Sequence, residues 1–363
     1  MLTTFVVAFA GYYFAAKKSE PYYEKKIDKI MFDTKNKSPK YVITLPDRDK
    51  ARKSKKAETP KQEEKVTVEN LAKVIPLVTK LTPLSNMEKS RVTALDTQLV
   101  QEENGMLLPK ISEKGKKPWT TYANEVNVQP NYYKVALVIK NLGQDVSLTQ
   151  ASVQSLPSEV SLSFSPYSFE MDEDIYKARM SGHETYADLL LPSKDYLKSD
   201  TGPLSLDLTS SVEQNKQKYL QTLNRKSPVG GIVINDGVAD KDNREQLQAI
   251  LKDMETRGIL LIDATSGDEI SSIKTQNLAR KKADIVLDDN FSKDNIRAAL
   301  TKAEEIAMEN GNVLVVMSPK PVVLVEVSEW IKSFSPQLTY EEAKNQTIDK
   351  PFALVPVSNL VVE

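Results

Sequence analysis

The sequence predicts an α/β fold, an irregular (β/α) barrel, for the C-terminal part of the chain. From residue 133 onward, short apolar segments rich in β-branched residues alternate with longer amphipathic segments, as β/α units do. Several apolar segments are hydrophobic on both faces, which is typical of parallel strands covered by helices. No GxGxxG or Walker-type loop is present, and Gly230-Gly231 precedes a strand instead of opening a helix. These observations favour a barrel over a nucleotide-binding sheet.

Eight segments are expected to form the strands, each short, apolar and bounded by polar or turn-forming residues. They are 135–139, 160–165, 185–191, 231–235, 259–263, 284–288, 313–317 and 352–357. Two of the intervening helices are predicted sharply. Segment 243–257 repeats apolar residues at i, i+3, i+4 and i+7 and stops at Gly258, and segment 293–310 carries an apolar stripe and stops at Gly311.

The composition of the 363-residue chain excludes several kinds of partner and of catalytic site. The net charge is -1, so no global field draws nucleic acid, and we expect no nucleic-acid partner. The absence of Cys excludes disulfides, thiolate nucleophiles and Cys-ligated zinc. One His in the whole chain is a tighter constraint, because most hydrolytic zinc sites use two or three imidazoles.

The N-terminal region predicts an anchor and a tether. Residues 1–16 contain an apolar run followed at once by Lys17 and Lys18, which indicates a short membrane anchor, with a cleaved signal or a buried helix as alternatives. Residues 17–106 are polar and Lys-rich and are expected to form a largely disordered linker. The basic excess after the anchor would hold this side in the cytoplasm by the positive-inside tendency. Residues 107–363 form the predicted folded domain.

A series of sequence blocks carries a resemblance to a known family. The blocks are LLPKISEKGKKPWTTYANEV (107–126), YKVALVIKNLG (133–143), VSLSFSPYS (160–168), SGHE (181–184), VGGIVINDG (229–237), RGILLIDATS (257–266), ADIVLDDN (283–290), VLVVMSPKP (313–321) and ALVPVSNL (353–360). In this order they resemble the divergent polysaccharide deacetylase family from 107 to 360. The resemblance implies a barrel on the outer side of a bacterial cytoplasmic membrane, related to enzymes that remove acetyl groups from envelope polysaccharides. In such enzymes one carboxylate and two imidazoles hold a divalent ion, and a second carboxylate acts as the base.

The chain departs from this pattern at the residues that would carry the chemistry. Lys140-Asn141 stand where the family has Asp-Asp, and Asn235-Asp236 stand where it has His-Met. Ser318 replaces the His of a Gly-His-Pro block. The His expected after the Gly-His-Glu block is also missing, and gap placement puts Asp188 or Leu190 opposite it. A two-imidazole site therefore cannot form within one chain.

We accordingly expect weak or no hydrolase activity and no metal cofactor. The open end of the barrel, its mouth, is expected to bind an envelope glycan or an envelope protein. The predicted binding residues are Lys140, Asn141, Asn235, Asp236, Asp288 and Ser318. Pairing of Lys140 with Asp263 or Asp288 would favour this interpretation, because an ammonium group would then fill the place of the ion. A further hypothesis is an anchored structural tether, in which the barrel has no binding or catalytic function.

The alternative is an active deacetylase with a rebuilt, carboxylate-rich site. His183, Asp236, Asp263 and Asp288 lie at or near strand ends, where barrel active sites gather, and oxygen ligands would favour magnesium, manganese or calcium. Asp263 and His183 are its catalytic candidates.

Each candidate also has a purely structural interpretation. His183 would be an exposed or hydrogen-bonded turn residue, and Asp263 would cap a following helix. Asp289 or Asn290 would cap the helix that begins near residue 292. Aromatic residues that could stand on the mouth loops are Tyr167, Phe169, Tyr186, Tyr196 and Phe291, with packing as their expected role.

Overall fold

The computed structural model describes residues 94–192, 201–207, 210–235, 244–289, 291–337 and 351–361, all within one compact unit of the chain. The predicted anchor 1–16 and most of the predicted linker lie outside the described residues. Within the described ranges, no helix combines the length and the hydrophobicity that a membrane span needs.

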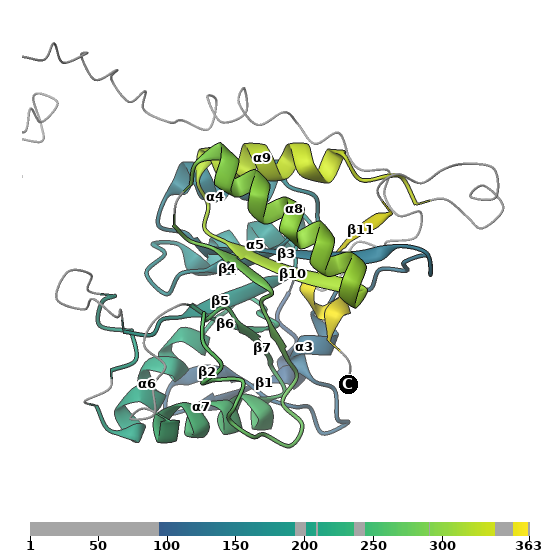
Figure 1. Cartoon of the computed structure of the whole chain (residues 1–363). Coiled ribbons are helices and arrows are strands. Elements are labelled where there is room, and N and C mark those ends of the chain that lie inside the picture. The colour runs from purple at the N-terminus through teal and green to yellow at the C-terminus, as the bar shows by residue number, and fades with distance from the viewer. Residues whose placement is uncertain are drawn as a thin grey trace, which may run out of the picture. The chain divides into compact units, whose positions relative to one another are not determined.

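The core of the fold is a curled parallel sheet that fits an irregular (β/α) barrel (Figure 1). A strand occurs at each of the eight predicted segments, and the parallel pairing is continuous from β7 through β3 to β10. The strands are β3 (Tyr133–Leu142), β4 (Ser161–Phe164), β5 (Thr185–Leu189), β6 (Gly231–Ile234), β7 (Leu260–Asp263), β9 (Ile285–Leu287), β10 (Asn312–Met317) and β11 (Phe352–Val355).

An additional short strand, β8 (Arg280–Lys282), lies at one end of the sheet, and β9 lies at the other end. β8 pairs with β7, whereas β9 pairs with β10 at the other end, and only Ala283 and Asp284 separate β8 from β9. Ala283 N donates to Asp263 O at 2.8 Å, and Asp284 N donates to Leu314 O at 2.9 Å. One extended segment thus bridges β7 and β10, where the sequence predicted a single strand. β11 adds to the first half of β3.

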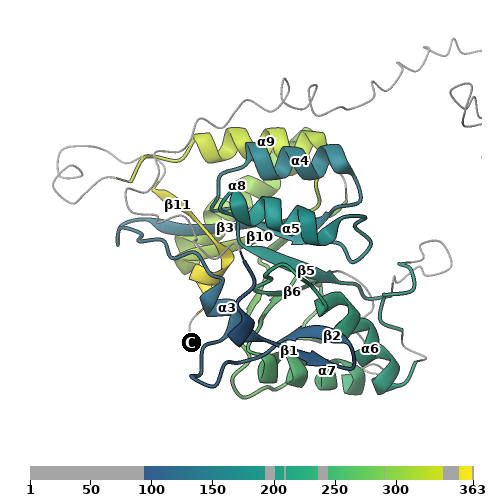
Figure 2. The same cartoon turned by 180° about the vertical axis from the view of Figure 1, so that it is seen from behind.

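Helices surround the sheet, one after most strands (Figures 1 and 2). On one side lie α4 (Val146–Ser155), α5 (Met171–Met180), α8 (Lys293–Asn310) and α9 (Pro321–Lys332), and on the opposite side lie α6 (Val212–Leu223) and α7 (Arg244–Arg257). Both sharply predicted helices are confirmed. Gly258 and Gly311, which end α7 and α8, have φ of 64° and 79°, the left-handed conformation that glycine adopts without strain.

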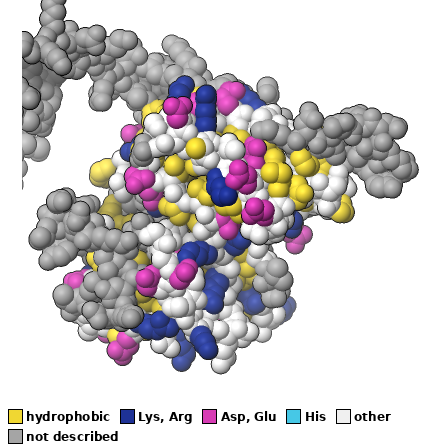
Figure 3. Space-filling model, in the orientation of Figure 1, with side chains coloured by type: hydrophobic (Ala, Val, Ile, Leu, Met, Phe, Trp, Pro, Cys, Tyr) yellow, Lys and Arg dark blue, Asp and Glu magenta, His cyan; other side chains and the backbone are white. Residues whose placement is uncertain are grey.

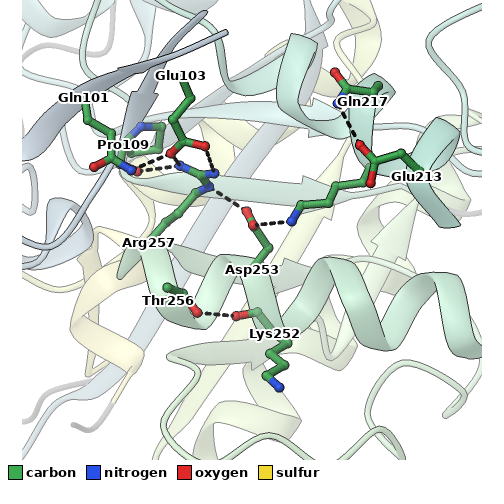
Figure 4. Close-up of polar contacts among 10 residues, drawn as sticks. Gln101, Glu103, Pro109, Glu213, Gln217, Lys252, Asp253, Thr256 and Arg257 are labelled. Carbon is green, nitrogen blue, oxygen red and sulfur yellow. Dashed lines mark hydrogen bonds and ion pairs between the residues drawn. The ribbon is translucent and has the colours of Figure 1, made fainter.

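A hairpin of β1 (Val100–Glu103) and β2 (Met106–Pro109) packs beside α6 and α7. Arg257 at the end of α7 holds the hairpin in place. Its guanidinium donates to both Glu103 carboxylate oxygens at 2.9 and 3.1 Å and to Pro109 O at 3.1 Å (Figure 4). It also donates to Asp253 Oδ2 of α7 at 2.5 Å. The folded region therefore starts upstream of residue 107. A short helix, α3 (Pro118–Thr121), and two 3₁₀ turns, 97–99 and 357–360, complete the described elements.

Two apolar layers follow from the alternation of side chains along the strands. Val135, Leu137 and Ile139 of β3 face the helices, whereas Ala136 and Val138 belong to a second cluster inside the barrel. β10 repeats this pattern, because Leu314 and Val316 face inward. The interior is filled with side chains as a small barrel requires, and this alternation decides which residues form the next inward layer.

The face drawn in Figure 3 mixes Lys and Arg with Asp and Glu side chains, without a large patch of one sign among the described residues.

Candidate functional site

The candidate site is the inward layer of side chains at the carboxyl ends of the strands. Continuing the period of two from the apolar interior places Lys140 after Val138 on β3, and Ser318 after Val316 on β10. By the same count Asn235 follows Val233, Asp188 follows Tyr186, and Asp288 follows Val286. Polar and charged residues thus replace the apolar ones at the end of the barrel where catalytic and binding groups collect.

A cavity of about 790 Å³ opens onto this layer. Among its lining residues are all five of the described residues that the sequence predicted for binding: Lys140, Asn141, Asn235, Asp288 and Ser318. The sixth, Asp236, lies outside the described residues. The volume lies in the range of small-ligand sites.

An ion pair forms the floor of the cavity. Lys140, which is only 1% exposed, donates from its ammonium group to Asp288 Oδ2. The other carboxylate oxygen of Asp288 accepts from Ser318 Oγ at 2.9 Å. The charge of the buried Lys140 is therefore compensated, as burial demands, and Asp288 accepts through both of its oxygens.

Two amides extend this pair into a chain of hydrogen bonds. Asn141 Nδ2 donates to Ser318 Oγ at 3.2 Å, and Asn235 Nδ2 donates to Asn141 Oδ1 at 3.0 Å. Side chains from β3 and from the ends of β6, β9 and β10 are connected in this way. The site is a single polar network, whose members the sequence placed in four separate blocks.

Asn141 reaches the cavity because the strand is irregular there. Its φ is 60°, and the pairing of β3 with β4 shifts register between Ile139 and Leu142. A left-handed conformation at a residue other than glycine is uncommon, and Asn tolerates it best. The irregularity lets two consecutive residues, Lys140 and Asn141, contact the same polar network.

Asp188 supports the network from behind. Its carboxylate is fully buried and accepts from Asn141 N at 2.8 Å and from Ser163 Oγ at 2.6 Å. Burial raises the pKa of Asp188 to about 6, against the hydrogen bonds and the nearby Lys140 charge, which lower it. The sequence comparison left Asp188 and Leu190 as alternatives opposite the missing His. Both residues share the inward alternation with Tyr186, and they differ in their contacts: Asp188 accepts from Asn141 N, whereas Leu190 lines the cavity.

The two predicted catalytic candidates lie on the other face of the sheet. Asp263 follows the outward Leu261, and its carboxylate accepts from Thr265 N at 3.0 Å, Thr265 Oγ1 at 2.6 Å and Ser271 Oγ at 3.1 Å within its own loop. His183 is buried, and its Nδ1 and Nε2 lie 2.8 and 3.1 Å from the carbonyl oxygens of Val160 and Val153. Burial lowers the pKa of His183. Neither residue lines the cavity.

The capping prediction for Asp289 or Asn290 is wrong. Ser292 is the N-cap of α8, since its Oγ accepts from Asn295 N at 3.3 Å. The preceding Asp288 is instead drawn inward by Lys140.

Two of the predicted mouth aromatics, Tyr167 and Phe291, line the cavity, and the Lys320 ammonium lies 5.6 Å from the centre of the Phe291 ring. Phe169 is 90% exposed. Tyr186 is buried and donates to Glu184, while Tyr196 lies outside the described residues.

The donor set does not fit a divalent cation. The described residues contain no group of three His, Asp or Glu side chains arranged to hold a metal ion. Where the family resemblance implies a carboxylate pair, Lys140 and Asn141 supply an ammonium group and an amide, and the ammonium would repel a cation. The two carboxylates of the layer, Asp288 and Asp188, accept hydrogen bonds from protein groups through both of their oxygens.

Comparison with known proteins agrees with the fold and identifies the family. The structure is similar to that of the uncharacterized protein ATU2773 from Agrobacterium tumefaciens C58, with a TM-score of 0.60 and 23% identity over 70% of this chain and 100% of that one. A putative cellobiose-phosphate cleavage protein from Enterococcus faecalis V583 matches with a TM-score of 0.42 and 12% identity over 64% of this chain and 100% of that one. No curated protein matches the sequence. The sequence model of the divergent polysaccharide deacetylases matches residues 137–360, and the chain therefore belongs to the divergent polysaccharide deacetylase family.

Proposed function

We propose that this protein binds a cell-envelope glycan in the cavity and has lost the metal-dependent hydrolysis of its family. The observation that carries the proposal is the Lys140–Asp288 ion pair. It places a protein cation where the family resemblance implies a metal ion, and it engages a carboxylate that a metal would otherwise use.

The remainder of the cavity suits an uncharged sugar. Amide and hydroxyl groups of Asn141, Asn235 and Ser318 provide polar contacts, and the rings of Tyr167 and Phe291 provide apolar faces. Aromatic faces with a few placed polar groups match a sugar, which presents hydroxyls at its edges and C–H groups on its faces. Membership in a family of polysaccharide deacetylases supports a polysaccharide ligand.

The same proposal includes a location. Residues 1–16 would anchor the protein in the cytoplasmic membrane of a bacterium, with the barrel on the outer side, where an envelope glycan or an envelope protein is its partner. The apolar run of residues 1–16 supports the anchor, and the family resemblance supports the outer side, although the basic excess after the anchor favours the cytoplasmic side by the positive-inside tendency.

A second candidate function, an active deacetylase with a rebuilt site, is favoured by Asp188. A buried carboxyl whose pKa is about 6 has the basicity of a general base near neutral pH. Asp188 nevertheless gives its oxygens to Asn141 N and Ser163 Oγ and does not line the cavity. Catalysis through Asp188 would require Asn141 to move.

The test is to combine calorimetric titration of the full chain with an acetate-release assay on the same chitotetraose sample. We expect saturable binding and no acetate release, with or without added zinc or manganese. Acetate release that disappears in Asp188→Asn would establish the second candidate. Absence of binding to chitotetraose and to peptidoglycan fragments would refute a glycan-binding function.

A further inference from the structure

The hydrogen-bond chain at the floor of the cavity has a fixed direction. Asp288 is a carboxylate that accepts from Lys140, so Ser318 must donate its only proton to Asp288. Ser318 Oγ can then only accept from Asn141, which orients the Asn141 amide with Nδ2 toward Ser318. Asn141 Oδ1 consequently faces Asn235, whose Nδ2 donates to it. The orientation of both amides follows from the charge on Asp288.

This direction leaves one atom without a partner, the Oδ1 of Asn235. Asn235 is 5% exposed, and its Oδ1 accepts no hydrogen bond from the described part of the protein. A buried acceptor without a donor is costly. Four other side chains in the described ranges also have such an atom, namely those of Asn124, Tyr219, Gln246 and Ser328, but Asn235 is the one that lines the large cavity.

We infer that Asn235 Oδ1 is a specificity-determining acceptor that binds a neutral O–H or N–H donor of the ligand. The inference rests on the proposed glycan-binding function and assigns a contact within it. A hydroxyl of any sugar or the N–H of an acetamido group supplies this donor. A ligand group that offers only acceptors is rejected at this position, because Asn235 Nδ2 donates to Asn141 Oδ1 and hydrogen-bonds to the Asp188 carboxylate.

Asn235→Leu tests the inference, since leucine is similar in size and cannot accept a hydrogen bond. Asn235→Ser is a second, smaller variant in case leucine disturbs folding, and Asn277→Leu is the matched control at an exposed position. Dissociation constants of the full-length proteins are measured for chitotetraose and for cellotetraose, which lacks acetamido groups. Thermal unfolding verifies that each variant is folded.

The expected result is about fivefold weaker binding in Asn235→Leu, the effect of one neutral hydrogen bond, with no change in Asn277→Leu. A loss for both oligosaccharides identifies a hydroxyl as the donor. A loss for chitotetraose alone identifies the acetamido N–H.

The side-chain amide of Asn235 provides an independent measurement. In the ¹⁵N-labelled protein, donation of a ligand proton to Oδ1 should shift the Nδ2 proton signals that are absent from Asn235→Leu. Wild-type binding that is unaffected by Asn235→Leu, with unshifted amide signals, overturns the inference and leaves the proposed function intact. If the wild type binds neither oligosaccharide and no peptidoglycan fragment, the proposed function fails, and the inference fails with it.

Discussion

The barrel interior holds two polar clusters at its opposite ends, one buried and one open to the cavity, and they are built differently. At the amino ends of the strands, Glu184 accepts from Asn124 N and Tyr186 Oη at 2.8 Å each and from Ser358 Oγ. At the carboxyl ends, the network around Asp288 opens onto the cavity and ends in the unpaired Oδ1 of Asn235. The first cluster connects segments far apart in the sequence, whereas the second leaves a hydrogen-bond acceptor, Asn235 Oδ1, for a ligand. Burial of charge alone therefore does not indicate function.

The largest effect is expected at the first cluster. Glu184→Leu leaves the donors of Asn124, Tyr186 and Ser358 without an acceptor inside the barrel, and we expect a loss of about 4 kcal/mol in the free energy of unfolding. Urea denaturation followed by circular dichroism measures it. Glu184→Gln keeps one acceptor and should lose less. A Glu184→Leu variant as stable as the wild type would show that this cluster does not fasten the barrel.

The pH dependence of stability should report on Asp188. Its folded pKa is raised to about 6 from an ordinary 3.8, so the folded state binds more protons than the unfolded state between these values. Stability from this group is therefore greatest below pH 3.8 and is lost as the pH rises through 6, by on the order of 3 kcal/mol. Because Glu184 also has a pKa raised by burial, the difference between wild type and Asp188→Asn isolates Asp188. A difference that does not change between pH 4 and pH 7 would contradict the raised pKa.

Breaking the Lys140–Asp288 pair should cost less, since the Asp288 side chain is 30% exposed. Asp288→Asn leaves the buried Lys140 ammonium with weaker compensation, for an expected loss of about 2 kcal/mol. The double variant Lys140→Met, Asp288→Asn removes the unpaired charge and should recover most of that loss. Denaturation of the single and double variants forms a double-mutant cycle. Additive effects would mean that the two charges do not interact.

The smallest effects compare two serines, each of which donates to the carboxylate of one of the two polar clusters. Ser318→Ala should lose about 1 kcal/mol, because water from the cavity can replace the hydroxyl at Asp288. Ser358→Ala should lose about twice as much, because Glu184 is fully buried and lies in the closed cluster. Equal losses in urea denaturation would remove the distinction between a closed cluster and an open one.

The sequence predicted the strands and two helices well, because these depend on local periodicity and on end signals such as Gly258 and Gly311. It could not predict that segment 280–287 divides between two strands, since that division depends on how the sheet curls. The β1–β2 hairpin was missed because its packing depends on Arg257, more than 140 residues away.

For the candidate site, comparison of family blocks found Lys140, Asn141, Asn235, Asp288 and Ser318. It could not rank Asp188 above Leu190, because both share the alternation with Tyr186 and only the hydrogen bond from Asn141 N shows that Asp188 supports the network. The roles suggested for His183 and Asp263 rested on strand ends alone. Both side chains point away from the barrel interior, and this direction is known only once the structure shows which alternate residues of each strand face inward.

The most direct test of the central claim is to titrate chitotetraose into the full-length protein with an excess of EDTA, and again after EDTA has been replaced by zinc. A glycan-binding site with Lys140 in place of the metal predicts the same dissociation constant in both titrations and no release of acetate. Binding that requires zinc, or acetate that forms only with zinc, would contradict the account and favour a metal-dependent deacetylase.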